Sequence, residues 1–200
     1  MPSRADDLAA RISELERELE DELDQARERW RFRLDRGRVR FERNARLAHK
    51  RLRQSIPRFI REASLLSMAT APIIYSLIVP FALLDLWVSL YQRICFPIYG
   101  IARVRRGQYI AIDRHHLAYL NGIEKMNCVF CGYANGVIAF VREVGGRTEQ
   151  YWCPIRHARR VRSPHAHYRE FLDYGDAQGY HKRLPVLRNQ LKHDKRSSGS

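Results

Sequence analysis

The chain has 200 residues and a formal net charge of +14, with 36 Lys and Arg against 22 Asp and Glu. This length suits one medium domain or a small domain with appendages, and four cysteines in 200 residues argue against the disulfide framework of a small secreted protein. The excess of positive charge predicts a polyanionic partner, for which anionic lipid headgroups and nucleic acid are the two candidates.

Charge is unevenly distributed along the chain. Residues 1–26 hold nine acids and three arginines, residues 27–62 hold fourteen Lys and Arg against four acids, and residues 103–200 hold eighteen against eight. Residues 63–102 hold one acid and one arginine. Together with the hydrophobic pattern, these blocks predict a mainly α-helical protein in five parts: a coiled-coil-like acidic amphipathic helix (1–36), a basic interfacial arm (37–62), a membrane-embedded apolar hairpin (63–101), a Cys3His metal-binding domain (102–175) and a disordered basic tail (176–200).

The first part is predicted to be a helix with a narrow apolar stripe. Apolar residues recur at spacings of three and four between Glu and Arg, and they are Leu8, Ile12, Leu15, Leu19, Leu23, Ala26 and Trp30. So narrow a stripe suits the seam of a coiled coil, through which the helix recruits a partner or self-associates. A helix that folds back on its own chain is an equal alternative.

Residues 29–41, "RWRFRLDRGRVRF", lead into the basic arm and interleave arginine with aromatic and aliphatic residues. Such a pattern can stack nucleic-acid bases on its aromatic rings. It can also lie at a bilayer interface while the guanidinium groups reach lipid phosphates.

The apolar segment after the arm favours the bilayer. Residues 63–84 carry no charge over twenty-two positions, "ASLLSMATAPIIYSLIVPFALL". As a helix this run is about 33 Å long, close to the ~30 Å hydrocarbon core of a membrane. The sequence therefore predicts membrane localisation.

The topology of the apolar segment is open between two arrangements. Pro72 and Pro80 interrupt it, and arginines flank both of its ends. A hairpin rising through 63–80 and returning through 81–101 would keep both flanks, and hence the N- and C-terminal regions, in the cytoplasm. A single span is the alternative. In the hairpin, Asp85 lies at the turn near the headgroups.

Further helices are expected in the C-terminal half. Asp113 is a plausible N-cap for a helix over 114–126. Residues 135–152 show helical spacing, although a β-hairpin turning at Gly145-Gly146 is also possible. A helix is expected to start at Cys153, because Pro154 suits its first position, and to end at Pro164.

The cysteines suggest a metal site. Cys128-x2-Cys131 is followed after twenty-one residues by Cys153-x3-His157. A CxxC turn brings two thiolates together, and Cys and His four apart on a helix converge on one face. Three Cys and one His are a usual set for structural Zn²⁺. Iron, and no metal at all, including a redox dithiol at Cys128 and Cys131, are the alternatives.

With a hairpin between the two pairs, the pattern resembles a treble-clef zinc finger. The phrases "CVFCGY" and "WCP" also resemble the knuckles of rubredoxin, an iron protein with four cysteine ligands, but His157 stands where rubredoxin needs a Cys. The strings "YQRICFPIYGI", "IDRHHLAYLNGIEK" and "EQYWCPIRHARR" are similar to a family of uncharacterised bacterial membrane-associated proteins. That resemblance implies membrane association and no particular activity.

Enzymatic activity is not supported by the sequence. It contains no phosphate-binding glycine loop, nucleophile elbow or paired carboxylates, and its histidines lack the arrangement of a membrane multi-His iron site. The sequence thus predicts a membrane-anchored zinc-binding protein with a non-enzymatic accessory, scaffold or assembly role, bound to anionic lipid and to a protein partner. The alternatives are a rubredoxin-like iron protein that passes electrons to a membrane enzyme and a nucleic-acid-binding protein.

Overall fold

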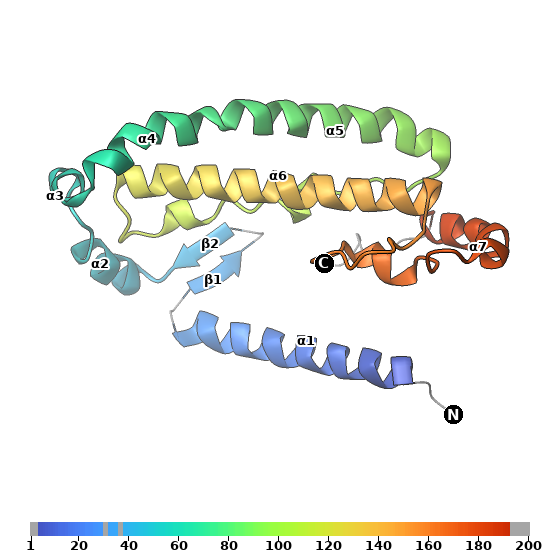
Figure 1. Cartoon of the computed structure of the whole chain (residues 1–200). Helices are drawn as coiled ribbons and strands as arrows, with labels where there is room; N and C mark the ends of the chain where they lie inside the picture. The colour runs from blue at the N-terminus through green and yellow to red at the C-terminus, as the bar shows by residue number, and fades with distance from the viewer. Residues whose placement is uncertain (1–3, 30–31, 36–37, 193–200) are drawn as a thin grey trace. The chain divides into compact units, whose positions relative to one another are not determined.

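A computed structural model of the chain describes residues 4–29, 32–35 and 38–192 (Figure 1). This part is mainly helical, as the sequence predicts, and it divides into two compact units. The first holds the chain up to Glu62 with Asp113–Met126, and the second holds Ala63–Ile112 and the chain from Asn127 onward. The elements are α1 (Arg4–Arg29), β1 (Phe32–Asp35), β2 (Arg38–Phe41), α2 (Arg43–Arg51), α3 (Ile56–Glu62), α4 (Leu65–Ser76), α5 (Ile78–Tyr99), α6 (Gly122–Trp152) and α7 (Ala177–Gln190), with short 3-10 turns at Arg106–Gln108, Arg114–His116 and Ala166–Glu170.

Helix α1 confirms the predicted N-terminal helix (1–36) over Arg4–Arg29, but the predicted end is wrong because Phe32–Asp35 form a strand. Leu15, Leu19 and Leu23 of its apolar stripe are exposed, and Trp30 lies outside the described residues. The coiled coil stays a prediction.

Across the boundary between the predicted helix (1–36) and the basic arm (37–62), the chain forms an antiparallel strand pair. Strand β1 pairs with β2 in the register Phe32↔Phe41 to Asp35↔Arg38. The residues alternate apolar and charged, the period-two pattern of a strand, which the prediction of a helix (1–36) followed by a basic interfacial arm (37–62) overlooks. Helices α2 and α3 complete the arm.

The apolar segment forms two consecutive helices that Figure 1 shows as one arch beside α6. Together they make a 35-residue helix, Leu65–Tyr99, long and apolar enough to cross a membrane. The predicted hairpin turn near residue 80 is wrong, because α5 runs without a break from Ile78 to Tyr99. Pro80 lies in the first turn of α5, where its missing N–H needs no partner.

Helix α6 begins later and runs further than the sequence predicts. Its N-cap is Asn121, whose Oδ1 accepts hydrogen bonds from the backbone N–H of Ile123 and of Glu124, each at 3.0 Å, while the Glu124 carboxylate accepts one from the Asn121 N–H at 2.8 Å. This reciprocal capping box starts the helix. The predicted Asp113-capped helix is wrong: Arg114–His116 form one 3-10 turn. The predicted helix over 135–152 is confirmed, and its hairpin alternative is not found.

A segment that we call the strap, Ile101–Ile112, packs along α6 in the second unit. At Gly136 an added Cβ would lie 2.7 Å from Ile110 Cα and 2.9 Å from Tyr109 O. Only glycine therefore allows this close approach. The apolar core next to it is formed by α5, the strap, α6 and the residue after α7, and consists of Phe96, Ile101, Val104, Phe140, Val144 and Leu191.

The chain leaves α6 in an extended conformation, so the predicted helix from Cys153 to Pro164 is wrong. Ile155 forms a parallel bridge with Leu172, supported by the bond from Arg156 N–H to Leu172 O at 2.7 Å. Pro154 lacks an N–H, and its carbonyl accepts from Leu172 N–H at 2.9 Å instead of from a following helical turn.

A helix, α7, also forms in the segment from residue 176, so the disordered tail predicted there is wrong over Ala177–Gln190. Asp176 caps α7 through a bond from the Gly179 N–H at 2.8 Å. Leu187 and Leu191 are buried, and Leu187 O accepts a bond from the Gln150 amide of α6 at 2.9 Å. An apolar stripe in a polar, basic segment is enough to dock a short helix. Residues 193–200 lie outside the described part.

Candidate functional site

Two of the four predicted metal ligands are neighbours. Cys128 and Cys131 lie one turn apart on α6, the first half-buried and the second exposed. Cys153 follows the last residue of α6, and His157 lies in the extended segment beyond. Twenty-one residues of helix lie between Cys131 and Cys153, which places the two cysteines about 33 Å apart along α6. The structure thus brings Cys128 and Cys131 together and keeps them away from Cys153 and His157.

Among the described residues, no group of three or more His, Cys, Asp or Glu side chains is placed to hold a metal ion. The pKa of the Cys153 thiol is raised by partial burial and by the negative charge of Glu149, which disfavours the thiolate that binds zinc. The backbone N–H of His157 donates to Tyr168 Oη at 2.8 Å. The four-residue zinc site stays a prediction, and it requires the middle of α6 to leave its helical conformation.

Several polar residues surround Asp85, which lies halfway along the apolar helix. The sequence did not indicate that these residues would meet. Arg106 of the strap donates from Nε to Oδ1 at 2.9 Å and from Nη2 to Oδ2 at 2.6 Å. Tyr133 Oη of α6 donates to Oδ2 at 3.0 Å, and Ser89 Oγ lies 3.5 Å from Oδ1. The Asp85 side chain is 10% exposed. Asp85 is therefore a paired acid in a helix and not the residue of a turn.

Other polar side chains of α5 also face the protein interior. Gln92 Oε1 accepts from the Val104 N–H at 3.1 Å, and Tyr91 Oη lies 3.1 Å from Thr148 Oγ1 of α6. We call Asp85, Ser89 and Gln92 the inward polar row. Its members recur at spacings of four and three and so share one face of α5.

The opposite face of α5 is apolar and exposed, and we call it the outward face. Trp87 on this face is 72% exposed. The outward face consists of Val79, Leu83, Leu86, Trp87, Leu90, Ile94 and Ile98. A helix of a water-soluble protein buries its apolar stripe and exposes its polar one. In α5 the polarity is inverted, as in a protein whose outer surface meets lipid.

A second polar cluster joins α6 to the segment after it. Glu143 accepts bonds from Arg147 Nε at 2.8 Å and pairs with His167 Nε2 at 3.0 Å, while Glu149 pairs with His165 Nε2 at 2.8 Å. Arg147 is 1% exposed and donates to Ala102 O of the strap at 2.7 Å. Each carboxylate has a basic partner, so the cluster ties three segments together.

The electrostatics of this cluster hold Glu143 ionised. Burial opposes ionisation, but the hydrogen bonds from His167 and Arg147 outweigh it and hold the pKa of Glu143 at about 2. Gly146 leaves the space for the histidines, because a Cβ there would lie 2.8 Å from His165 Nδ1. The sequence signal was present in His165-x-His167, but nothing in the sequence paired these histidines with two acids of a distant helix.

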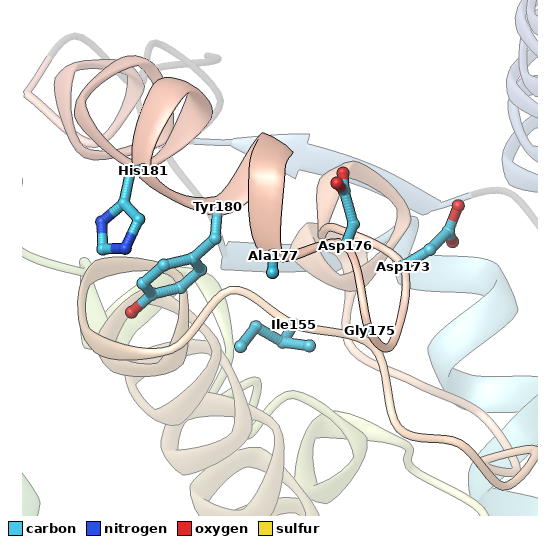
Figure 2. Close-up of a pocket in the computed structure, with 7 residues that line it drawn as sticks. All are labelled: Ile155, Asp173, Gly175, Asp176, Ala177, Tyr180 and His181. Carbon is cyan, nitrogen blue, oxygen red and sulfur yellow. The ribbon is translucent and has the colours of Figure 1, made fainter.

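A shallow hollow of about 230 Å³ lies at the start of α7 (Figure 2). It is lined by Ile155, Asp173, Gly175, Asp176, Ala177, Tyr180 and His181. Asp173 is paired with Arg156 at 2.8 Å and Asp176 caps α7. Both carboxylates are thus engaged, and the rest of the lining is mostly apolar.

Comparison of the chain with known protein families, with curated proteins and with solved structures finds no match. The resemblance to bacterial membrane-associated proteins noted from the sequence stays a prediction. Among the features of the described residues, the inverted polarity of α5 is the most specific.

Proposed function

We propose that this protein is a membrane-associated, non-enzymatic accessory or scaffold protein, held on anionic lipid through the α4–α5 helix. The observation that carries the proposal is the inverted polarity of α5, with Asp85 and Gln92 buried and Trp87 exposed. Exposing so much apolar surface to water is unfavourable at roughly 25 cal/mol per Å², and a bilayer removes that cost.

The charge distribution supports lipid as the partner. The apolar helix is preceded by residues 27–62, with fourteen Lys and Arg against four acids, and is followed by the arginine-rich strap. Basic residues beside an apolar surface reach the phosphates of anionic lipids.

Flotation of the full chain with vesicles tests the proposal. The chain should float with vesicles containing anionic lipid and remain bound after a high-salt wash, because apolar burial is not screened by salt. Trp87→Glu places a charge on the outward face and should lower the apparent affinity at least tenfold.

Tyr174→Glu is the matched control. Tyr174 is as exposed as Trp87, at 72%, but lies in the loop before α7, so its substitution should leave binding unchanged. Recovery of the parent chain in the salt-washed soluble fraction, or equal effects of the two substitutions, would contradict the proposal.

A further inference from the structure

The strap constrains how the α4–α5 helix can lie in a membrane. It is irregular backbone apart from the 3-10 turn at Arg106–Gln108, and it carries the exposed residues Arg103 and Arg105. Arg106, which is 47% exposed, reaches Asp85, and Ile110 lies against Gly136 in the middle of α6. The strap therefore runs from the end of α5 back to the middle of both long helices.

This arrangement is incompatible with α5 crossing the bilayer while the second unit keeps its fold. Asp85 lies fourteen residues before the end of α5 at Tyr99, which is about 21 Å along the helix axis. A crossing helix would carry Arg106 and the neighbouring strap to that depth. Lipid-exposed irregular backbone does not occur in the hydrocarbon region, and arginine there is costly.

The length of the helix leads to the same conclusion. The 35 residues of Leu65–Tyr99 extend about 52 Å, well beyond the ~30 Å hydrocarbon core. The outward face continues along α4, where Leu65, Leu66 and Ile73 are also exposed. Exposed apolar residues thus extend along the whole length of the helix, which fits a surface parallel to the helix axis.

Taking the proposed membrane association as its basis, we infer that α4 and α5 lie in the plane of one leaflet, with the outward face in the acyl region and the strap and α6 on the aqueous side. The protein is then monotopic and not membrane-spanning. Arg93, on the flank of the outward face, and the exposed strap arginines can reach the phosphates of anionic lipids. An in-plane amphipathic helix is typically buried about 5–10 Å into the boundary of headgroups and acyl chains.

Depth measurement along the outward face tests this inference. In a full-length background with Trp30, Trp87 and Trp152 replaced by Phe, a single tryptophan is introduced by Leu83→Trp, Leu90→Trp or Ile98→Trp. Each variant is bound to anionic vesicles, and lipids brominated at different acyl positions quench its fluorescence. Neighbouring sites are seven or eight residues apart, or about 10–12 Å along the helix. Circular dichroism of each variant should match that of the three-Phe background, because Leu83, Leu90 and Ile98 are exposed.

We expect the three sites to lie at the same shallow depth within a few ångströms. In a crossing helix no three of these positions share one distance from the midplane, so depths that differ by about 10 Å would overturn the inference while leaving the proposed membrane association intact. Failure of the parent chain to bind vesicles, for example because two copies cover each other's outward faces in solution, would instead overturn the proposed function on which the inference rests.

Discussion

The two long helices of the second unit differ in which residues they bury and which they expose. Helix α5 buries Asp85 and Gln92 and exposes Trp87, whereas α6 buries Val137 and Phe140 and exposes Arg142. One unit thus contains a helix that buries polar residues beneath an exposed apolar face and a helix whose buried face is mainly apolar, with Arg147 among the buried residues. The outward face of α5 lies on the side of the helix that points away from the apolar core.

The two helices also hold their polar contacts differently. Asp85 of α5 depends on one arginine that is half-exposed, while Glu143 of α6 lies between Arg147 and His167, both nearly fully buried. Changes to these two sites, and to the helix packing between them, measure how much each region contributes to stability.

The largest effect is expected at Glu143. Its pKa is about 2 in the folded protein against about 4.3 in an unfolded chain, so its contribution is present above the unfolded pKa and is lost as the pH falls toward 2. The linkage amounts to about 3 kcal/mol. Urea unfolding in detergent between pH 7 and pH 2 should show this loss in the parent, and Glu143→Gln should be less stable at neutral pH with a flatter pH profile.

Asp173→Asn is the matched control for this experiment. Asp173 also pairs with an arginine, at 2.8 Å, but its side chain is 79% exposed, and exposed pairs contribute little. If Glu143→Gln unfolds with the pH dependence of the parent, the cluster around Glu143 does not stabilise the fold.

A somewhat smaller effect is expected from Arg106→Leu. Removing one partner of a fully buried ion pair costs about 3–5 kcal/mol, and the partial exposure of Arg106 reduces this to about 2–3 kcal/mol. The loss of free energy of unfolding should be largely restored in Asp85→Leu/Arg106→Leu, since no unpaired acid remains. Arg105→Leu, at an exposed arginine one residue earlier, should have little effect, and an equal loss in both single variants would contradict the pairing.

Glycine-to-alanine substitutions in α6 should have opposite effects on stability at its packed face and at its exposed face. Gly136→Ala forces a Cβ to within 2.7 Å of the strap backbone and should destabilise by about 2 kcal/mol. Gly145→Ala meets nothing within 4 Å and should stabilise by about 0.5–1 kcal/mol, because alanine favours a helix. Thermal unfolding followed by circular dichroism measures both changes, and a shift of the same sign in the two variants would show that the strap does not lie against Gly136.

The sequence was informative where a single local pattern decides the structure. The charge-free run that becomes α4 and α5 and the apolar stripe of α1 both predicted helices. The start of α6 was misplaced by eight residues because Asp113 and Asn121 are both good N-caps, and the choice depends on Glu124 completing a capping box. A local sequence pattern does not show which of two possible N-cap residues will start the helix.

Contacts between distant segments could not be predicted from the sequence. The partner of Asp85 is twenty-one residues away, and Glu143 meets His167 across twenty-four. The predicted hairpin placed its turn at Pro80. This proline does not interrupt the helix, because it lies in the first turn of α5. No spacing rule indicates which acids and bases a fold will bring together.

The smallest effect of a substitution is expected at the cysteines. With α6 continuous, Cys131 is exposed on its surface, so Cys131→Ser should leave the unfolding midpoint unchanged, and zinc should alter neither it nor the helix content. The zinc site predicted from the sequence gives the opposite expectation. Cys131 and Cys153 lie about 33 Å apart along α6, so the four ligands can meet only if α6 opens, and metal binding would then stabilise the C-terminal half. Metal analysis of the purified chain with circular dichroism distinguishes the two. One zinc per chain, lost in Cys131→Ser together with stability, would show that α6 and the extended segment after it adopt another arrangement when metal is bound.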